Sequence, residues 1–254
     1  MLEIKNVSKT FNPGTVNAKT ALNGLNLTLN DGDFVTVIGG NGAGKSTMLN
    51  AVAGTIQVDT GSIILDGRDI TRLPEFKRAA YLGRVFQDPM MGTAATMQIE
   101  ENLALADRRG KRRTLHPGIT QADRERYIEQ LKILDLGLEN RMTAKVGLLS
   151  GGQRQALTLL MATLQKPELL LLDEHTAALD PKTAAKVLEA TQRIVEKNRL
   201  TTMMITHNMR DAISYGNRLI MMYEGHVVVD VSGEEKKNLT VEQLLNLFSR
   251  ASGS

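Results

Sequence analysis

Residues 39–47, GGNGAGKST, have the residue types and spacing of a loop that binds the phosphates of a nucleotide. Their glycines let consecutive backbone N–H groups wrap around a β-phosphate, because a backbone without side chains can approach an anion closely. In such a loop the lysine would reach the β- and γ-phosphates, the serine hydroxyl would bind Mg²⁺, and the threonine would lie near the α-phosphate. We therefore expect the nucleotide to be bound by Gly39, Gly40, Asn41, Gly42, Ala43, Gly44, Lys45, Ser46 and Thr47.

A second group of chemical interest is the acidic pair that ends the apolar run LLLLDE (169–174). Such a run is typical of a strand buried on both faces of a parallel sheet, and open α/β sheets bind ligands at the carboxyl ends of their strands. Asp173 would hold Mg²⁺, chiefly through its water shell, and Glu174 would orient and deprotonate an attacking water. An ordinary turn or helix cap is the alternative, and the phosphate loop elsewhere in the chain argues against it.

The segment LSGGQRQ (149–155) supplies another helix start suited to an anion. The N–H groups of a first helical turn are unpaired and carry a partial positive charge, and glycine allows an anion to come close. A helix N-cap without any ligand is the simplest alternative. The residues by themselves do not say which anion would bind there.

The elements that must position these groups alternate between strand and helix patterns. LEIKNVSKTF, LNLTLNDGD, FVTVIGG and GSIILDGRDIT predict strands near the N-terminus, and LLLLDEH, TTMMITH and RLIMMYEGHVVVD predict strands in the second half. KSTMLNAVAG, closed by Gly54, and PKTAAKVLEATQRIVEKN predict helices. A polar segment with helical patterns, roughly residues 95–148, lies between them. This order predicts an α/β core that carries a helical subdomain.

The composition limits the classes of protein that remain. With 254 residues, 42% hydrophobic and 23% charged, the chain can form a packed core of one large α/β domain or two small ones. It has no cysteine, which excludes disulfides, thiolate metal sites and a cysteine nucleophile. We see no secretory signal and no apolar run near the ~20 residues that cross a bilayer, so a cytosolic protein is expected.

These motifs, with Gln87 in VFQDP, AALD (177–180) and His207 in ITHNM, occur in the order seen in ABC-type ATPase subunits. The chain resembles that family over essentially its whole length. The resemblance implies an α/β fold, with a RecA-like P-loop NTPase core, an antiparallel β subdomain and an α-helical insert subdomain. A single ABC ATPase domain (1–254) would then comprise a core (1–94 and 155–231), a helical signature subdomain (95–154) and a C-terminal helical tail (232–254).

The resemblance also assigns a role to the second helix start. In this family two ATPase subunits pack head to tail, and each ATP lies between the phosphate loop of one subunit and the signature motif of the other. The signature motif acting in trans would be Ser150, Gly151, Gly152 and Gln153. Asp180 would lie in a dimer-contact loop, and it can also cap the helix that begins at Pro181.

Further residues take their roles from the same resemblance. Gln87 would sense Mg²⁺ and the attacking water and link the site to a membrane partner. His207 would contact the γ-phosphate and steady the water, so that Glu174, His207 and Gln87 form the catalytic set. Phe11 is the candidate for stacking on adenine, with a place in the core as the alternative. The implied Mg²⁺ ligands are Ser46, Gln87 and Asp173.

Two features stand apart from the family pattern. The family commonly has proline after the catalytic glutamate, where this chain has His175. We interpret it as a tolerated substitution. The alternatives are a second base, a metal ligand, or a residue that adjusts the pH dependence of hydrolysis.

The basic run RRGKRR (108–113) is interpreted as a solvated loop, with contact to anionic lipid or to acidic loops of a membrane subunit as alternatives. No nucleic-acid partner is expected, because no aromatic residues are interleaved with the run.

The resemblance implies an energy-coupling subunit that hydrolyses ATP for an ABC membrane transporter, with ATP and Mg²⁺ as cofactors. Its partners would be a second copy, separate transmembrane permease subunits and an extracytoplasmic solute-binding protein. It would be cytoplasmic and peripheral on the inner face of the cell membrane. DEHTAALD and residues 81–106 resemble a prokaryotic importer subgroup for amino acids, with aromatic amino acids as candidate substrate. A soluble ABC ATPase of the iron–sulfur assembly type is the alternative, although that class usually follows the signature with Glu-Lys-Lys rather than Gln-Arg-Gln.

Overall fold

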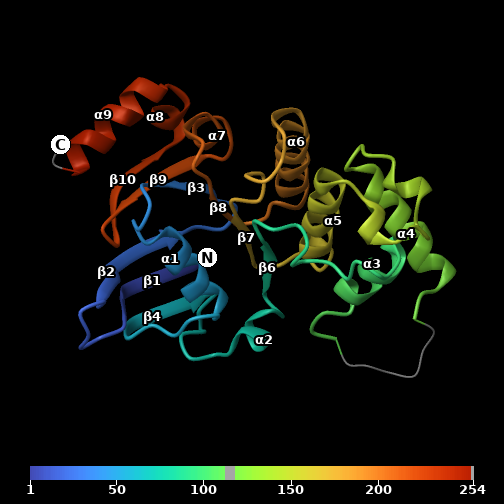
Figure 1. Ribbon diagram of the computed structural model, residues 1–254, viewed down its shortest axis with the longest axis horizontal. Coiled ribbons are helices and arrows are strands. Elements are labelled where there is room, and N and C mark those ends of the chain that lie inside the picture. The colour runs from blue at the N-terminus through green and yellow to red at the C-terminus, as the bar shows by residue number, and fades with distance from the viewer. Residues whose placement is uncertain (112–117, 253–254) are drawn as a thin grey trace.

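The structure is a computed structural model that describes residues 1–111 and 118–252 (Figure 1). Its strands are β1 (Leu2–Phe11), β2 (Lys19–Leu29), β3 (Phe34–Ile38), β4 (Thr60–Leu65), β5 (Arg68–Asp69), β6 (Leu82–Val85), β7 (Leu169–Asp173), β8 (Thr202–Ile205), β9 (Arg218–Tyr223) and β10 (His226–Ser232). Its α-helices are α1 (Lys45–Ala53), α2 (Glu75–Arg78), α3 (Ile99–Asp107), α4 (Gln121–Lys132), α5 (Gly151–Thr163), α6 (Pro181–Asn198), α7 (Met209–Ser214), α8 (Gly233–Lys237) and α9 (Val241–Ser252). Short 3₁₀ turns follow α4 at Leu138–Asn140 and Val146–Leu148.

A six-stranded sheet in the order β10-β9-β3-β8-β7-β6 forms the centre of the fold. Strands β9, β3, β8, β7 and β6 run parallel, whereas β10 pairs antiparallel with β9 in a hairpin. All of β3 is buried, and so are Leu169–Leu172 of β7, because helices cover both faces of the sheet. The apolar runs around the predicted phosphate loop and acidic pair are therefore the interior strands of this sheet.

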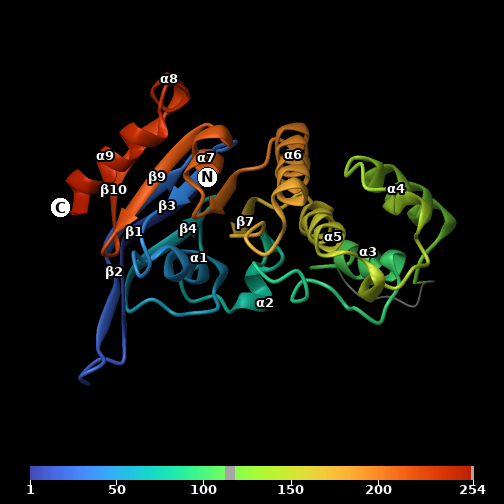
Figure 2. The ribbon, with the colours of Figure 1, turned by 45° about the horizontal axis from the view of Figure 1, so that its top comes forward.

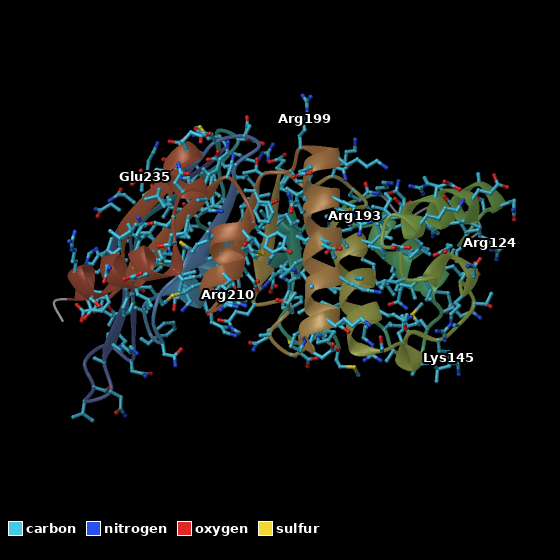
Figure 3. The ribbon with its side chains drawn as sticks, turned by 90° about the horizontal axis from the view of Figure 1, so that it is seen from above. Arg124, Lys145, Arg193, Arg199, Arg210 and Glu235 are labelled. Carbon is cyan, nitrogen blue, oxygen red and sulfur yellow. The ribbon has the colours of Figure 1, made fainter. Side chains whose placement is uncertain are left out.

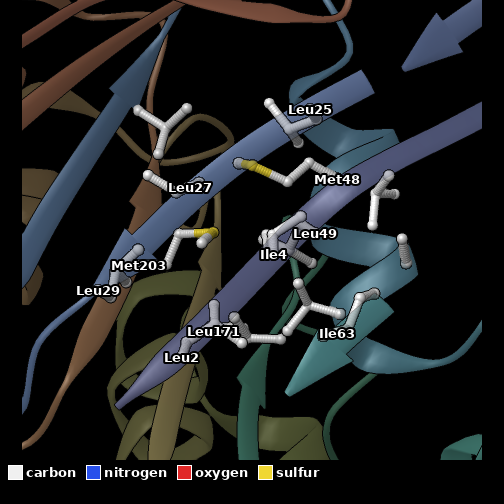
Figure 4. Packing of buried hydrophobic residues seen from close by; sticks show 14 of the residues in the cluster. Leu2, Ile4, Leu25, Leu27, Leu29, Met48, Leu49, Ile63, Leu171 and Met203 are labelled. Carbon is white, nitrogen blue, oxygen red and sulfur yellow. The ribbon is translucent and has the colours of Figure 1, made fainter. Parts of the chain in front are cut away.

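A four-stranded antiparallel sheet, in the order β2-β1-β4-β5, shares a hydrophobic core with the central sheet. Leu25, Leu27 and Leu29 of β2 are buried, as their alternation in the sequence predicts. Figure 4 shows this core, in which α1 packs its apolar side chains between the two sheets. The labelled side chains come from β1 and β2, from α1, and from β4, β7 and β8: Leu2, Ile4, Leu25, Leu27, Leu29, Met48, Leu49, Ile63, Leu171 and Met203.

Helices α3, α4, α5 and α6 build a second core around the opposite face of β7 and β8. α3 and α4 lie at one end of the molecule and the C-terminal helices α8 and α9 at the other (Figures 1 and 2). Arg193 of α6 donates to the carbonyl oxygen of Ile133 at 3.3 Å, which ties the segment after α4 to the core (Figure 3). The predicted boundary at residue 154 falls inside α5, so one helix belongs to both the core and the helical part.

The C-terminal segment forms a third, smaller core. Leu244 of α9 is fully buried against Ile38, Ala212 and Met221, so the apolar face of the amphipathic tail packs against the protein.

Arg112 and Arg113 of the basic run lie outside the described residues. Within the described part of the chain, no helix is long and apolar enough to cross a membrane.

Candidate functional site

Four predicted segments meet at one edge of the central sheet. The phosphate loop follows β3, His207 follows β8, Asp173 ends β7, and Gln87 lies just beyond β6. These strands are parallel neighbours, so their carboxyl ends lie at the same edge. The Thr206 amide donates to the Val37 carbonyl at 3.1 Å, which fixes the turn before His207 against the phosphate-loop strand.

The phosphate loop closes around its own lysine. The Lys45 ammonium donates to the carbonyl oxygens of Gly39 and Gly40 at 2.7 and 3.1 Å. Burial lowers the pKa of Lys45, and the carboxylates of Glu174 and Asp173 oppose that shift. Gly44 caps α1 with φ of 102°, and a Cβ there would lie 2.5 Å from the Ala21 carbonyl oxygen, so this turn requires glycine.

A pocket of about 260 Å³ opens over this loop, and because the sequence predicts that ATP binds here, it is called the ATP pocket below. Its walls are Phe11, Lys19, Ala21, Asn41, Gly42, Ala43, Gly44, Lys45, Ser46, Thr47 and Glu174. The exposed ring of Phe11 thus lies at the pocket and outside the core. The sequence analysis did not single out Lys19, which pairs with Phe11 across the β1–β2 hairpin. That register is the signal that would have revealed a cation beside the predicted aromatic residue.

Glu174, which lines the ATP pocket, faces His207, which is not among the lining residues. A Glu174 carboxylate oxygen lies 3.5 Å from His207 Nδ1, and the His207 side chain is 63% exposed. Glu174 has a positive φ of 44°, a strained conformation for a residue with a side chain, and its amide donates to the Ile205 carbonyl of β8 at 3.1 Å. The chain therefore holds this carboxylate beside the loop that carries His207.

Asp173 is the more buried member of the acidic pair. Its carboxylate lies 3.4 Å from the Arg84 guanidinium of the neighbouring strand β6. Burial raises the pKa of Asp173, and the positive charges of Arg84 and Lys45 counteract that rise. Arg84 belongs to none of the predicted motifs, because only strand pairing places it beside this carboxylate.

Gln87 lies at the junction of the core and the helical part. Its side chain is exposed and is not among the residues that line the ATP pocket. The preceding residue, Phe86, is fixed by α5, because Gln155 Nε2 donates to its carbonyl oxygen at 2.9 Å. The structure therefore places Gln87 at the predicted sheet edge. The segment that carries it is hydrogen-bonded to α5, which begins at the signature motif and is called the signature helix below.

Beside Gln87 runs a large hollow, about 1040 Å³, between the end of β6 and helices α3, α4 and α5. It is called the subdomain groove below. Phe86, Met91 and Leu105 line it, and the last two are 67% and 57% exposed. Arg108, Arg109 and Lys111 of the basic run also line it.

The signature residues lie outside the ATP pocket of the same chain. Ser150 caps α5: its hydroxyl accepts from the Gln153 amide at 3.3 Å, and the Gln153 side chain accepts from the Ser150 amide at 3.2 Å. Gly152 is buried, and a Cβ there would overlap the Thr183 methyl group of α6. Gly151 and Ser150 are exposed, so the helix start is open to the outside on this side, while the Ser150 and Gln153 N–H groups are used in the cap.

Asp180 caps α6, as the sequence predicts. Its carboxylate accepts from the Thr183 amide at 3.0 Å, with proline at the first helical position, and hydrogen bonds from the Thr183 side chain and amide lower the pKa of Asp180. Because Thr183 also packs on Gly152, the cap of α6 and the start of α5 lie side by side.

His175 points away from the acidic pair into the core. It is 2% exposed, its Nε2 lies 3.1 Å from the Thr191 hydroxyl of α6, and burial lowers its pKa to about 4. The described residues contain no cluster of acidic and histidine side chains that could hold a metal ion by themselves. The interpretation of His175 as a tolerated substitution agrees with this position, and a role as second base or metal ligand does not.

The comparisons with known proteins agree with this geometry. A family model described as "ABC transporter" matches residues 22–177. The chain is 47% identical to the tyrosine transport ATP-binding protein of Clostridioides difficile, over 99% of this chain and 100% of that protein. The chain belongs to the ABC transporter family.

Two further likenesses place this ABC ATPase among known cassettes. It is 33% identical to the spermidine/putrescine import ATP-binding protein PotA of Pasteurella multocida, over 98% of this chain and 65% of that protein. A solved dimeric ATP-binding cassette in a post-hydrolysis state, bound to ADP and phosphate, matches with a TM-score of 0.76 at 30% identity, over 91% of this chain and 98% of that one.

The family membership confirms the main predictions. The fold is the α/β fold of ABC cassettes, and the chain is an ATP-binding, ATP-hydrolysing subunit of an ABC transporter. ABC ATPases dimerise and work with transmembrane permease subunits. The relatives give the iron–sulfur assembly alternative no support.

Proposed function

We propose that this ABC ATPase hydrolyses Mg²⁺–ATP at the ATP pocket, with Glu174 as the general base. The observation that carries the proposal is the position of Glu174, which lines a pocket built on the phosphate loop and lies 3.5 Å from His207. Glu174 accepts the proton of the attacking water, and His207 holds that water and the γ-phosphate in line. The Lys45 ammonium exchanges its two backbone carbonyls for the β- and γ-phosphates.

The adenosine end of ATP has its own partners in this proposal. Adenine stacks on the exposed face of Phe11, and Lys19 supplies a cation opposite it on β2. The backbone N–H groups of Asn41–Thr47 surround the β-phosphate, and the Thr47 hydroxyl lies near the α-phosphate.

The donor set at the sheet edge fits Mg²⁺. Magnesium keeps several waters and takes only one or two protein ligands with substrate phosphates. The exposed Ser46 hydroxyl is suited to direct binding, whereas Asp173 and Gln87 suit the water shell. When bound, the metal neutralises charge that develops on the phosphates. Phosphate release on removal of Mg²⁺ with EDTA tests this assignment, and turnover that continues unchanged would contradict it.

The second half of the ATP site comes from another copy of the chain. Ser150, Gly151, Gly152 and Gln153 begin a helix whose N-terminus, with its partial positive charge and the exposed Gly151, is suited to a γ-phosphate, yet they do not line the ATP pocket of their own chain. In a head-to-tail dimer they approach the ATP bound by the partner, and the loop of Asp180 lies at the contact.

The permease docks in the subdomain groove, on the inner face of the membrane. Phe86, Met91 and Leu105 offer apolar contacts, and Arg108, Arg109 and Lys111 offer positive charge to an acidic permease loop. Exposed apolar side chains that gather in one hollow are typical of interaction sites.

The transported solute is an aromatic amino acid, delivered by an extracytoplasmic solute-binding protein. Support comes from the likeness at 47% identity to a protein named for tyrosine transport, which spans both chains almost completely. Tyrosine uptake into vesicles that contain the matching permease and binding protein tests this. The wild-type subunit should drive uptake and Glu174→Gln should not, and ATP-driven uptake of spermidine in place of tyrosine would contradict the assignment.

A further inference from the structure

Arg84 of β6 connects the acidic side of the ATP site to the subdomain groove. Its Nη2 lies 3.4 Å from Asp173 Oδ2 and donates to the Asn50 side-chain oxygen of α1 at 2.7 Å. Its Nη1 donates to the Thr55 hydroxyl at 3.3 Å. One guanidinium thus bridges the strand of the acidic pair and the helix that follows the phosphate loop.

The same guanidinium contacts the wall of the groove. It lies 4.6 Å from the centre of the Phe86 ring, and both Arg84 and Phe86 line the subdomain groove. The Phe86 carbonyl accepts the hydrogen bond from Gln155 of α5. A continuous path of contacts therefore runs from Asp173 through Arg84 and Phe86 to the signature helix.

Packing does not explain this arginine. Its side chain is only 14% exposed, and its Nε is buried without a hydrogen-bond partner among the described residues. A buried cation loses its hydration, and an apolar side chain of similar volume commonly supports stability as well as a buried ion pair does. A guanidinium in this place is therefore better explained by what its charge does to Asp173.

We propose that Arg84 is a positioning residue that neutralises Asp173 until Mg²⁺–ATP binds and then transmits binding to the groove. When the Asp173 carboxylate turns to the magnesium shell, Arg84 loses its anionic partner but keeps its contact with Phe86. The Phe86 wall and the Gln87 segment then rearrange. The inference rests on the proposed function, since it requires Mg²⁺ at Asp173 and a permease in the groove.

The chain offers a matched control at the other end of the same strands. Arg68 lies 4.1 Å from the centre of the Tyr81 ring and 3.1 Å from Glu168. Tyr81 and Glu168 directly precede β6 and β7, away from the phosphate loop. Arg68 itself lies on β5 and its side chain is more exposed than that of Arg84, at 42% against 14%, but Arg68→Met removes the same kinds of contact from the residues that precede β6 and β7, without touching the ATP site.

The test measures the dissociation constant of ATP with Mg²⁺ and with EDTA, in a Glu174→Gln background that stops turnover. The ratio of the two constants reports how strongly the metal assists binding. Arg84→Met removes a cation that competes for Asp173, so the ratio should rise about 3- to 10-fold. Arg84→Lys and Arg68→Met should stay within about twofold of the parent.

A second readout follows the groove itself. The chain has no cysteine, so Met91→Cys provides a single labelling site in the groove. Mg²⁺–ATP should change the fluorescence of an environment-sensitive label in the parent and in Arg68→Met, and Arg84→Met should lose that change. An unchanged ratio in Arg84→Met, or an undiminished fluorescence response, would overturn the inference. A parent that binds ATP equally with Mg²⁺ and with EDTA would instead refute the magnesium site on which it rests.

Discussion

In the proposed mechanism, Glu174 is the residue on which the chemistry depends most. Its carboxylate lines the ATP pocket, and the strained turn that holds it also brings it within 3.5 Å of His207. A backbone strain at such a place is maintained only when the surrounding structure enforces it. Strand pairing with β8 provides that enforcement here, through the hydrogen bond to Ile205.

Glu174→Gln should retain ATP binding and lose most turnover. The amide cannot accept the proton of the attacking water, and a positioned base commonly contributes 10²–10⁴-fold to the rate. We expect kcat to fall at least ~100-fold, with the Kd for ATP within about twofold of wild type. Phosphate release and equilibrium binding measure the two quantities. Hydrolysis at the wild-type rate would remove Glu174 from the role of base.

His175 should make the fold sensitive to acid. Its pKa in the folded chain is about 4, below the ordinary 6.5, so the unfolded chain binds a proton more readily between those values. The free energy of unfolding should therefore decrease as the pH falls from about 6.5 towards 4, by roughly 2 kcal/mol at pH 5. Urea unfolding at pH 7 and pH 5 measures the loss. His175→Met, which does not titrate, should lose less over the same interval, and equal losses would contradict the prediction.

At the scale of elements, the start of α5 combines two glycines with different tasks. Gly152 lets α5 pack directly on Thr183 of α6, whereas Gly151 faces outward beside the Ser150 cap. The helix start is therefore anchored on one side and open to a ligand on the other.

Replacing Gly151 and Gly152 one at a time should distinguish an effect on folding stability from an effect on dimerisation. Gly152→Ala forces a methyl group against Thr183 and should lower the free energy of unfolding by about 1–3 kcal/mol. Gly151→Ala should leave stability nearly unchanged, because its Cβ would lie 3.4 Å from the Leu179 side chain, but should weaken ATP-dependent dimerisation. Chemical denaturation and sedimentation distinguish the two effects. Equal destabilisation by both changes would show that the outward face has no separate task.

Most strands and helices were predictable from the sequence, whereas the side-chain contacts between them were not. Apolar runs such as LLLL at 169–172 predicted interior strands because a strand covered on both faces must be apolar throughout. Arg84 and Lys19 escaped prediction because their roles depend on which strands pair. Phe248 of α9 escaped prediction because its place depends on how the C-terminal helix packs: its ring would lie 3.7 Å from a Cβ on Gly40, so this helix reaches the phosphate loop.

At the scale of the whole molecule, the chain holds two complementary parts of an ATP site that do not meet. The ATP pocket is lined by the β1–β2 hairpin, the phosphate loop and Glu174, while the signature residues begin a helix outside it. The motifs themselves were readable from the sequence. Their separation within one chain was implied by the family resemblance, and the structure agrees with it, because the signature residues do not line the ATP pocket of their own chain.

The central claim is that each ATP is shared between the phosphate loop of one copy and the signature motif of another. Sedimentation equilibrium of Glu174→Gln, with and without Mg²⁺–ATP, tests it most directly. We expect the 27.8 kDa chain to become a dimer of twice that mass when ATP is added. Ser150→Arg in the same background should still bind ATP but remain monomeric. An ATP-bound Glu174→Gln chain that stays monomeric, or a Ser150→Arg chain that dimerises equally well, would contradict the account.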